Sequence, residues 1–165
     1  IGGYWPKFIH GQTYSEFMRH GSILDSANTE KNTKQLSDAL VHILGMLNGM
    51  SVHQTLVMGP SSEFVYSPLD CALRTDKLKI AGDYCNVPQA EMKAWLETST
   101  SAINSALSVS TKTALIETSS VFCDDVSCKS NEREVMYYTD YHHVSPAGAE
   151  KLLANTNFGT YLAVK

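Results

Sequence analysis

The feature that most constrains the fold is an alternation of short apolar runs with longer stretches of helical periodicity. Residues 54–58 and 113–117 are short apolar runs, the first followed at once by a Gly-Pro pair, and such runs predict buried strands. Residues 29–50 and 89–107 instead repeat apolar side chains along one face of a helix. This order predicts an α/β fold with a mainly parallel sheet and helices on both of its faces.

The remaining segments complete the predicted order of elements. Residues 1–5 are interpreted as the end of a strand, and residues 134–138 predict another strand. Residues 145–154 predict a final helix, with Ser145 as N-cap and Pro146 in the first turn. Three further stretches are expected to be mostly loop: residues 7–28, 61–88 and 119–131. With 165 residues and no linker or internal repeat, the chain is expected to be one domain.

Composition and charge exclude several classes of partner. The net charge is −4, and lysine and arginine are scattered without a basic stripe, which argues against nucleic acid. No apolar run approaches the roughly 20 residues that cross a membrane, and the N-terminus lacks the pattern of a signal peptide. Because the sequence starts abruptly and without an initiator methionine, we expect it to be cut from a longer protein.

The four cysteines fall into two close pairs, Cys71 with Cys85 and Cys123 with Cys128. A metal site is one interpretation, but the C-x-x-C spacing of a zinc knuckle is absent. Four free thiols would suit a cytosolic protein. Two local disulfides formed in an oxidising compartment explain the pairing better, so we expect these two bridges.

Asp140 and His143 are the residues best suited to chemistry, because they follow the last predicted strand and precede the capped helix. In α/β sheets of this kind, ligands bind beyond the carboxyl ends of the strands. A hydroxyl nucleophile needs a nearby base, and that base needs a third group that fixes its tautomer. We expect the Asp140 carboxylate to turn back onto Nδ1 of His143 and to leave Nε2 free. The spacing by itself is a weak signal, since aspartate and histidine are common in surface loops.

The neighbouring histidine and tyrosines have plainer explanations. His142 could join Asp140 in a metal site, but adjacent residues of an extended loop point apart and no fourth ligand is evident, so neither metal nor cofactor is expected. His142 is instead expected to face solvent or to bond a backbone carbonyl. Tyr137, Tyr138 and Tyr141 could line a sugar-binding wall, although strand packing with the hydroxyl groups in water is commoner.

The segment Asp140-Tyr141-His142-His143-Val144-Ser145-Pro146-Ala147-Gly148-Ala149 resembles the last block of the SGNH (GDSL-like) hydrolases. It is most similar to the SGNH domain fused to the membrane-bound acyltransferases that O-acetylate bacterial surface polysaccharides. Other parts of the chain also resemble that domain: Val57-Met58-Gly59-Pro60 with Glu63-Phe64, the two cysteine loops, and Ile1-Gly2-Gly3-Tyr4-Trp5. The resemblance runs through nearly the whole chain, and only the final block is specific.

This resemblance implies a three-layer α/β/α fold of the flavodoxin-like SGNH type and a Ser-His-Asp mechanism. Carried over to this sequence, His143 is the general base and Asp140 is its orienting carboxylate. Tyr4, Trp5 and Tyr141 are candidate substrate-binding residues, although the family often has arginine at position 4. The implied reaction needs no cofactor and no metal.

One part of the family pattern is missing, the Gly-Asp-Ser block that carries the nucleophile. Gly21-Ser22 and Asp25-Ser26 do not replace it, because they stand in the wrong order and after the wrong strand. We therefore expect residues 1–165 to be the C-terminal portion of a single SGNH-like domain that lacks its first strands. Such a chain is expected to be catalytically inert alone, and labelling of Ser22, Ser26 or Ser61 by a fluorophosphonate would contradict this.

The implied function is transfer of an acyl group, in the first instance acetyl, from an acyl donor to a cell-surface glycan. The resemblance places the domain at the periplasmic face of the bacterial inner membrane, with a membrane acyltransferase domain in the same parent chain. Two alternatives stay open: a carbohydrate esterase of the same fold, and a non-catalytic glycan-binding or structural module. A Gly-Asp-Ser block upstream in the parent gene would decide for catalysis.

Overall fold

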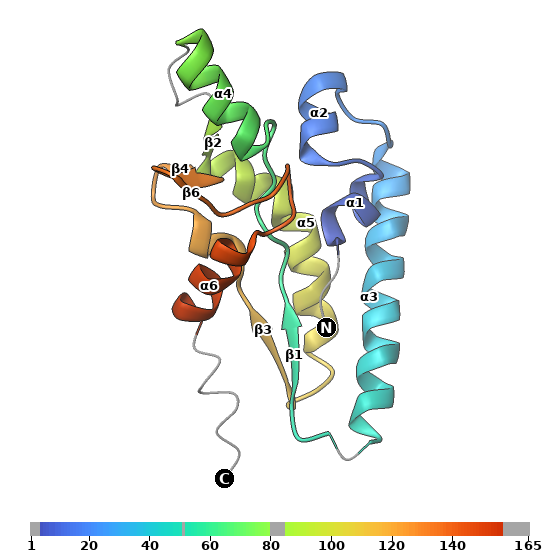
Figure 1. Ribbon diagram of the computed structural model, residues 1–165. Coiled ribbons are helices and arrows are strands. Elements are labelled where there is room, and N and C mark those ends of the chain that lie inside the picture. Colours follow the sequence, from blue (N-terminus) through green and yellow to red (C-terminus); the bar gives the residue numbers. More distant parts are fainter. Residues whose placement is uncertain (1–3, 51, 80–84, 157–165) are drawn as a thin grey trace.

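The long helices and the apolar strands lie close to where the sequence predicts them. The computed structural model describes residues 4–50, 52–79 and 85–156, and Figure 1 labels its elements. The predicted core elements are α3 (Ser26–Asn48), β1 (Thr55–Met58), α5 (Gln89–Leu107) and β3 (Thr113–Ile116). Helix α3 begins earlier than predicted because Asp25 is its N-cap, with Oδ1 accepting a hydrogen bond from the backbone N–H of Asn28.

Strands β1 and β3 pair in parallel, with Val57 opposite Leu115, which confirms an α/β chain with a parallel sheet. In Figure 1, α3 and α5 run side by side along this pair, with α1 (Trp5–His10) lying against both. Their contact surfaces form a core made only of apolar side chains: Trp5, Ile9, Leu36, Leu40, Leu44, Val57, Ala102, Ile103 and Ala106. We call this part of the molecule the packed half.

Two short helices replace the loop expected over residues 7–28, so that expectation is wrong. Helix α1 starts at Trp5 with a proline in its first turn, and Gly11 ends it in the left-handed conformation with φ of 70°. Helix α2 (Tyr14–His20) opens with a capping box between Thr13 and Glu16. The predicted strand end at residues 1–5 is likewise wrong at Trp5, while residues 1–3 lie outside the described residues.

The stretch over residues 61–88 also contains a helix that the sequence analysis missed. Helix α4 (Pro68–Leu78) is capped by the hydroxyl of Ser67, which accepts a hydrogen bond from the backbone N–H of Asp70. The following strand β2 (Val87–Pro88) pairs in antiparallel fashion with β4 (Ser127–Cys128). Between β3 and β4 the chain forms a short 3₁₀ helix, η2 (Ser119–Phe122).

The strand predicted over residues 134–138 is real only in part, and it does not join the parallel sheet. Strand β6 (Val135–Met136) pairs in antiparallel fashion with β5 (Asn131–Glu132) as a small hairpin. Arg133 lies in the turn with φ of 54°, a left-handed conformation that the sequence did not suggest. The candidate site therefore follows a hairpin and not the end of a strand in the parallel pair.

A second core lies under this hairpin and under α6 (Pro146–Asn155). It is rich in aromatic side chains and includes one disulfide sulfur: Tyr14, Phe64, Val87, Met92, Trp95, Leu96, Phe122, Cys128, Tyr137, Tyr138 and Leu152. Phe122 contacts both Tyr137 and Tyr138 through tilted or edge-on ring pairs. We call this part of the molecule the site half, because the candidate active site rests on it.

Both predicted disulfides are present. Cys71 in α4 is bonded to Cys85, and Cys123 after η2 is bonded to Cys128 in β4. The two bridges tie short peripheral elements of the site half to the rest of the chain. Among the described residues, none of the helices combines the length and the apolar character needed to cross a membrane.

Candidate active site

The dyad loop, residues 139–143, is a tight loop closed by backbone hydrogen bonds. The N–H of Thr139 donates to the carbonyl of His143 across a distance of 2.8 Å. Just outside the loop, the N–H of Ser145 donates to the carbonyl of Tyr137, also at 2.8 Å. These bonds fix both ends of the loop against the second core, so its side chains project from a defined frame.

Asp140 organises this loop through both of its carboxylate oxygens. Oδ1 accepts hydrogen bonds from the backbone N–H groups of His142 and His143 at 2.9 and 2.8 Å. Oδ2 lies 2.7 Å from Nδ1 of His143. Partial burial on its own would raise the pKa of Asp140, but these hydrogen bonds outweigh it and lower the pKa to about 2. The carboxylate is therefore ionised at neutral pH and fixes the histidine ring.

His143 presents the other side of its ring to solvent. Its side chain keeps 68% of its accessible surface, and within the described chain its ring makes hydrogen bonds only to Asp140. With Nδ1 engaged as a donor to Asp140, Nε2 is the unprotonated nitrogen of the neutral ring. This is the arrangement that a general base needs, because Nε2 can accept a proton from an incoming hydroxyl group.

His142 has a structural position, so the expectation that it faces solvent or bonds a carbonyl is wrong. Its side chain keeps 18% of its accessible surface and stacks on the Tyr4 ring, with centroids 4.3 Å apart. Burial and the nearby His143 lower the pKa of His142, against the opposing pull of Asp140. A neutral His142 thus supports the loop from below, while His143 faces outward.

Helix α6 holds the loop from its C-terminal side. The Ser145 hydroxyl accepts a hydrogen bond from the Gly148 N–H at 3.1 Å and donates one to the Met136 carbonyl at 2.6 Å. A Cβ atom at Gly148 would overlap the carbonyl oxygen of Tyr137 and lie 2.7 Å from Val144 Cγ1. Only glycine at this position lets the first turn of α6 pack this closely against the strand that leads into the loop.

Glu63 is a buried carboxyl behind the loop that the sequence analysis did not single out. It keeps 1% of its accessible surface, and its Oε2 accepts a hydrogen bond from the Tyr14 N–H at 2.7 Å. Oε1 has no well-formed hydrogen bond. Burial raises the pKa of Glu63 to about 7, against opposing interactions with the Tyr14 backbone, Trp95 and Tyr4.

Glu63 is joined to the dyad loop from two directions. The next residue, Phe64, donates its N–H to the carbonyl of Tyr141 at 2.8 Å. Tyr4, whose pKa is raised by burial and by Glu63, stacks on His142. The family resemblance includes Glu63-Phe64, but no local pattern predicts that Glu63 is buried, because its burial depends on residues far away along the chain.

The predicted substrate-binding residues are not equally placed for that role. Trp5 is buried and its indole N–H donates to the Met58 carbonyl at 3.0 Å, so no face of it is open to a substrate. Tyr137 and Tyr138 are buried in the second core, which excludes them from a sugar-binding wall. Tyr141 is partly exposed beside the dyad, and Tyr4 contacts the site through His142.

Comparison with known families identifies the family to which this chain belongs. A model of the family described as "SGNH domain (fused to AT3 domains)" matches residues 1–155. The chain belongs to this SGNH family. No curated protein and no solved structure matches it. Membership indicates an acyltransferase or esterase role, and the AT3 fusion indicates a membrane-associated parent protein.

The described part of this SGNH chain does not place a serine beside the dyad. No described serine hydroxyl is hydrogen-bonded to the His143 ring. Ser22 and Ser26, which the sequence analysis considered and set aside, border a separate hollow at the start of α3. Asp140 and His143 are therefore paired in the SGNH chain, and no described hydroxyl group is hydrogen-bonded to the His143 ring.

Three ligand atoms of the dyad loop could in principle approach a metal ion. One atom from each of Asp140, His142 and His143 lies within 4.8 Å of the others. Two of these atoms already face each other in the 2.7 Å contact between Asp140 and His143, and adjacent His142 lies below the ring of its neighbour. A metal bound through Asp140 Oδ2 or His143 Nδ1 would break the contact between them, so the geometry fits acid–base chemistry better.

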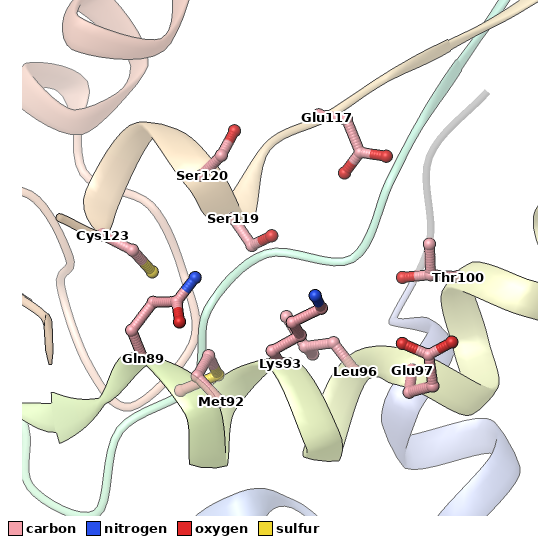
Figure 2. Close-up of a pocket in the computed structure, with 10 residues that line it drawn as sticks. All are labelled: Gln89, Met92, Lys93, Leu96, Glu97, Thr100, Glu117, Ser119, Ser120 and Cys123. Atoms are coloured by element: carbon pink, nitrogen blue, oxygen red, sulfur yellow. The ribbon is translucent and has the colours of Figure 1, made fainter. Parts of the chain in front are cut away.

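A cavity of about 280 Å³ lies away from the dyad, between α5 and residues 117–123. Figure 2 shows side chains of α5, among them Lys93 and Glu97, facing Glu117 and Ser119 across this space. None of its lining residues belongs to the dyad loop. The Asp140–His143 pair of the SGNH chain thus lies at an exposed surface and not in this cavity.

Proposed function

We propose that His143 and Asp140 are the general base and the orienting carboxylate of a serine-dependent acyl-transfer site. In this proposal, the parent protein transfers an acyl group, in the first instance acetyl, from an acyl donor to a cell-surface glycan. The observation that carries the proposal is the 2.7 Å contact between Asp140 Oδ2 and His143 Nδ1, on a ring whose Nε2 side faces solvent. Family membership supports it, because the SGNH domain is fused to AT3 domains.

The reaction proceeds through two rounds of proton uptake and release at the same nitrogen. His143 Nε2 takes the proton of a serine hydroxyl as the serine oxygen attacks the acyl carbonyl, and the protonated ring returns this proton to the leaving group. His143 then takes a proton from a sugar hydroxyl, which attacks the acyl-enzyme and releases the serine with that proton. The ionised Asp140 stabilises the positive charge that the ring carries after each transfer.

The serine is supplied from outside the described residues, since none of their hydroxyl groups is bonded to the His143 ring. Accordingly, residues 1–165 are the C-terminal portion of a single SGNH-like domain. The complete domain has the three-layer α/β/α arrangement of flavodoxin-like folds. It faces the periplasm beside the membrane domain of the same parent chain, which agrees with the two disulfides.

A second candidate is an esterase of the same fold, in which water replaces the sugar hydroxyl. The high exposure of His143 favours this candidate, because water reaches Nε2 without any rearrangement. The chemistry at His143 and Asp140 is the same in both cases. The products separate the two, since only the transferase yields an acylated glycan.

Replacing His143 with alanine in the parent protein tests the proposal. We expect loss of glycan acylation with an unchanged melting temperature, since the ring is exposed and its removal leaves no buried cavity. His142→Phe is the matched control, because a phenylalanine can keep the stacking on Tyr4. The assignment of His143 as the base would be wrong if His143→Ala kept glycan acylation. It would also be wrong if His142→Phe lost acylation completely without a change of fold.

A further inference from the structure

Two arginine–tyrosine contacts involve the dyad loop and the segment that is hydrogen-bonded to it. Arg19 of α2 lies over the ring of Tyr141, with its guanidinium carbon 5.7 Å from the ring centroid, and its Nη2 donates to the Val65 carbonyl at 3.2 Å. Arg74 of α4 lies over the ring of Tyr66 at 4.5 Å. Each guanidinium is thus held against an aromatic face, which limits its freedom before any ligand arrives.

The two contacts are joined to each other and to the dyad through the backbone. Tyr141 stands between Asp140 and His142, and its carbonyl accepts the hydrogen bond from Phe64. Val65, which accepts the bond from Arg19, and Tyr66 follow directly after Phe64. Both arginines therefore border one short pair of hydrogen-bonded segments that also positions the general base.

Neither arginine forms an ion pair with a described carboxylate, although the chain is acidic overall. The carboxylates one turn before them on their own helices are engaged elsewhere. Glu16, one turn before Arg19, accepts the N–H of Thr13 at 2.7 Å in the capping box. Asp70, one turn before Arg74, accepts the hydroxyl of Ser67 at 2.9 Å.

Arg19 and Arg74 differ from the other cationic side chains that the structure places in ion pairs or in the hairpin turn. The chain has three arginines, and the third, Arg133, lies in the hairpin turn. The lysines with described ion pairs are Lys34, Lys129 and Lys151, and their partners are surface carboxylates. The guanidinium groups beside the dyad keep free N–H donors, which are suited to binding a carboxylate or phosphate in a forked geometry.

We propose that Arg19 and Arg74 form an acceptor subsite for anionic sugar units, those that carry a carboxylate or a phosphate group. The proposal rests on the proposed function, because it names the class of glycan that the dyad would acylate. Arg19 and Arg74 hold the anionic group, so that a neighbouring hydroxyl of the glycan reaches His143. The tyrosine rings keep the guanidinium planes in place.

Binding measurements with matched sugars test the subsite without requiring catalysis. The probes are tetragalacturonate and its fully methyl-esterified counterpart, which differ only in charge, with mannose 6-phosphate and mannose as the phosphate pair. We expect both anionic probes to bind more tightly than their neutral counterparts, and the tighter of the two identifies the anionic group. The preference should weaken between 50 and 300 mM salt, as screening predicts.

Three variants locate the effect. Arg19→Gln and Arg74→Gln should each weaken tetragalacturonate binding about tenfold, which corresponds to about 1.4 kcal/mol, and leave the methyl ester unaffected. Arg133→Gln is the matched control and should bind like the parent protein. Equal binding of acid and ester, or an equal loss in Arg133→Gln, would overturn the proposal. His143→Ala should keep binding, so failure of the acyl-transfer assignment and failure of the acidic subsite are distinguishable.

Discussion

Helices α1, α3 and α5 meet mainly through apolar side chains. The dyad loop instead rests on a core with several tyrosines, and the carboxyl group of Glu63 is buried behind it. Among the described residues, most buried side-chain atoms without a well-formed hydrogen bond lie in the site half: the Tyr4 and Tyr138 hydroxyls, Glu63 Oε1, Trp95 Nε1 and His142 Nδ1. The remaining one, Ser99 Oγ, lies on α5. Each such atom costs free energy, since burial removes its water without replacing the bond. The site half therefore carries most of these costs, close to His143.

The largest expected effect separates activity from stability within the site half. Asp140→Asn keeps an oxygen for the two backbone N–H groups but puts an amide where Oδ2 now accepts from His143 Nδ1. The ring should then turn or change tautomer, and acyl transfer by the parent protein should fall on the order of 10⁴-fold. Glycan acylation assays report the loss, and a melting temperature within a few degrees of the parent shows that the loop is intact. A drop below tenfold would mean that Asp140 does not orient the base.

The second prediction concerns Gly148 and the closeness of α6 to the loop. Gly148→Ala introduces a methyl group into the space occupied by the Tyr137 carbonyl and Val144. The Tyr137 backbone can move away only at a large cost in free energy. We therefore expect the free energy of unfolding to fall by about 3 kcal/mol or more, and the Asp140–His143 contact to be lost. Denaturant unfolding measures the first effect, and the NMR signal of the His143 ring measures the second. A stable Gly148→Ala protein with an unshifted His143 signal would show that α6 can move without disturbing the site.

Some features of this fold can be predicted from residues that are neighbours in the sequence, and others cannot. The long helices, the two apolar strands, the Ser145 cap and the Asp140–His143 pair were predicted because each depends on residues close together in the chain. The capping box at Thr13 and Glu16, and Ser67 before Pro68, are local signals that would have revealed α2 and α4.

Other features depend on contacts between distant segments and leave no local pattern. Glu63 is buried by Tyr14 and Met92, which lie 49 and 29 residues away along the chain. Whether a short strand joins a parallel sheet or forms a hairpin is decided by its partner, as β6 shows with β5. The stacked position of His142 likewise requires Tyr4, at the other end of the chain.

The third prediction tests how far the site half depends on its disulfides. The Cys71–Cys85 bridge spans 14 residues and the Cys123–Cys128 bridge spans 5. Loop-closure entropy predicts losses of about 3 kcal/mol and about 2 kcal/mol when each pair is replaced by alanine. Urea unfolding of the two double variants checks the order. Equal midpoints for both variants and the parent protein would show that the bridges do not stabilise the fold.

The fourth prediction concerns Glu63 and pH. The pKa of Glu63 is raised to about 7 in the folded protein, above its ordinary value of 4.5. Below pH 4.5 the carboxyl is neutral in both states. As pH rises from 4.5 through 7, Glu63 loses its proton first in the unfolded chain. The free energy of unfolding should therefore fall by about 3 kcal/mol from its value below pH 4.5. Glu63→Gln should remove this pH dependence of the free energy of unfolding. Compared with the parent protein, the variant should therefore be more stable at pH 8 than it is at pH 5.

The control for Glu63 comes from the packed half. Glu30 is exposed on α3, and Glu30→Gln should follow the pH dependence of the parent protein. Histidines whose pKa is lowered by burial, His10 and His142, also change stability below their ordinary pKa of 6.5. The difference between Glu63→Gln and the parent protein at each pH isolates Glu63 from them. Parallel curves for these two proteins would mean that Glu63 is ionised without cost.

The smallest expected effect is a gain of stability from a glycine-to-alanine substitution in the packed half, opposite in sign to the effect at Gly148. Gly45 lies within α3, and a Cβ atom placed there would meet no atom within 4 Å. Alanine loses less conformational freedom than glycine on entering a helix, so Gly45→Ala should stabilise the fold by about 0.5–1 kcal/mol. Denaturant unfolding measures the gain, and both acyl transfer and the His143 signal should stay unchanged. The same substitution would then have opposite signs in the two halves, because in one half the added methyl group enters open space and in the other it strikes the backbone that frames the base. A loss of activity in Gly45→Ala would show instead that the packed half is mechanically coupled to the dyad loop.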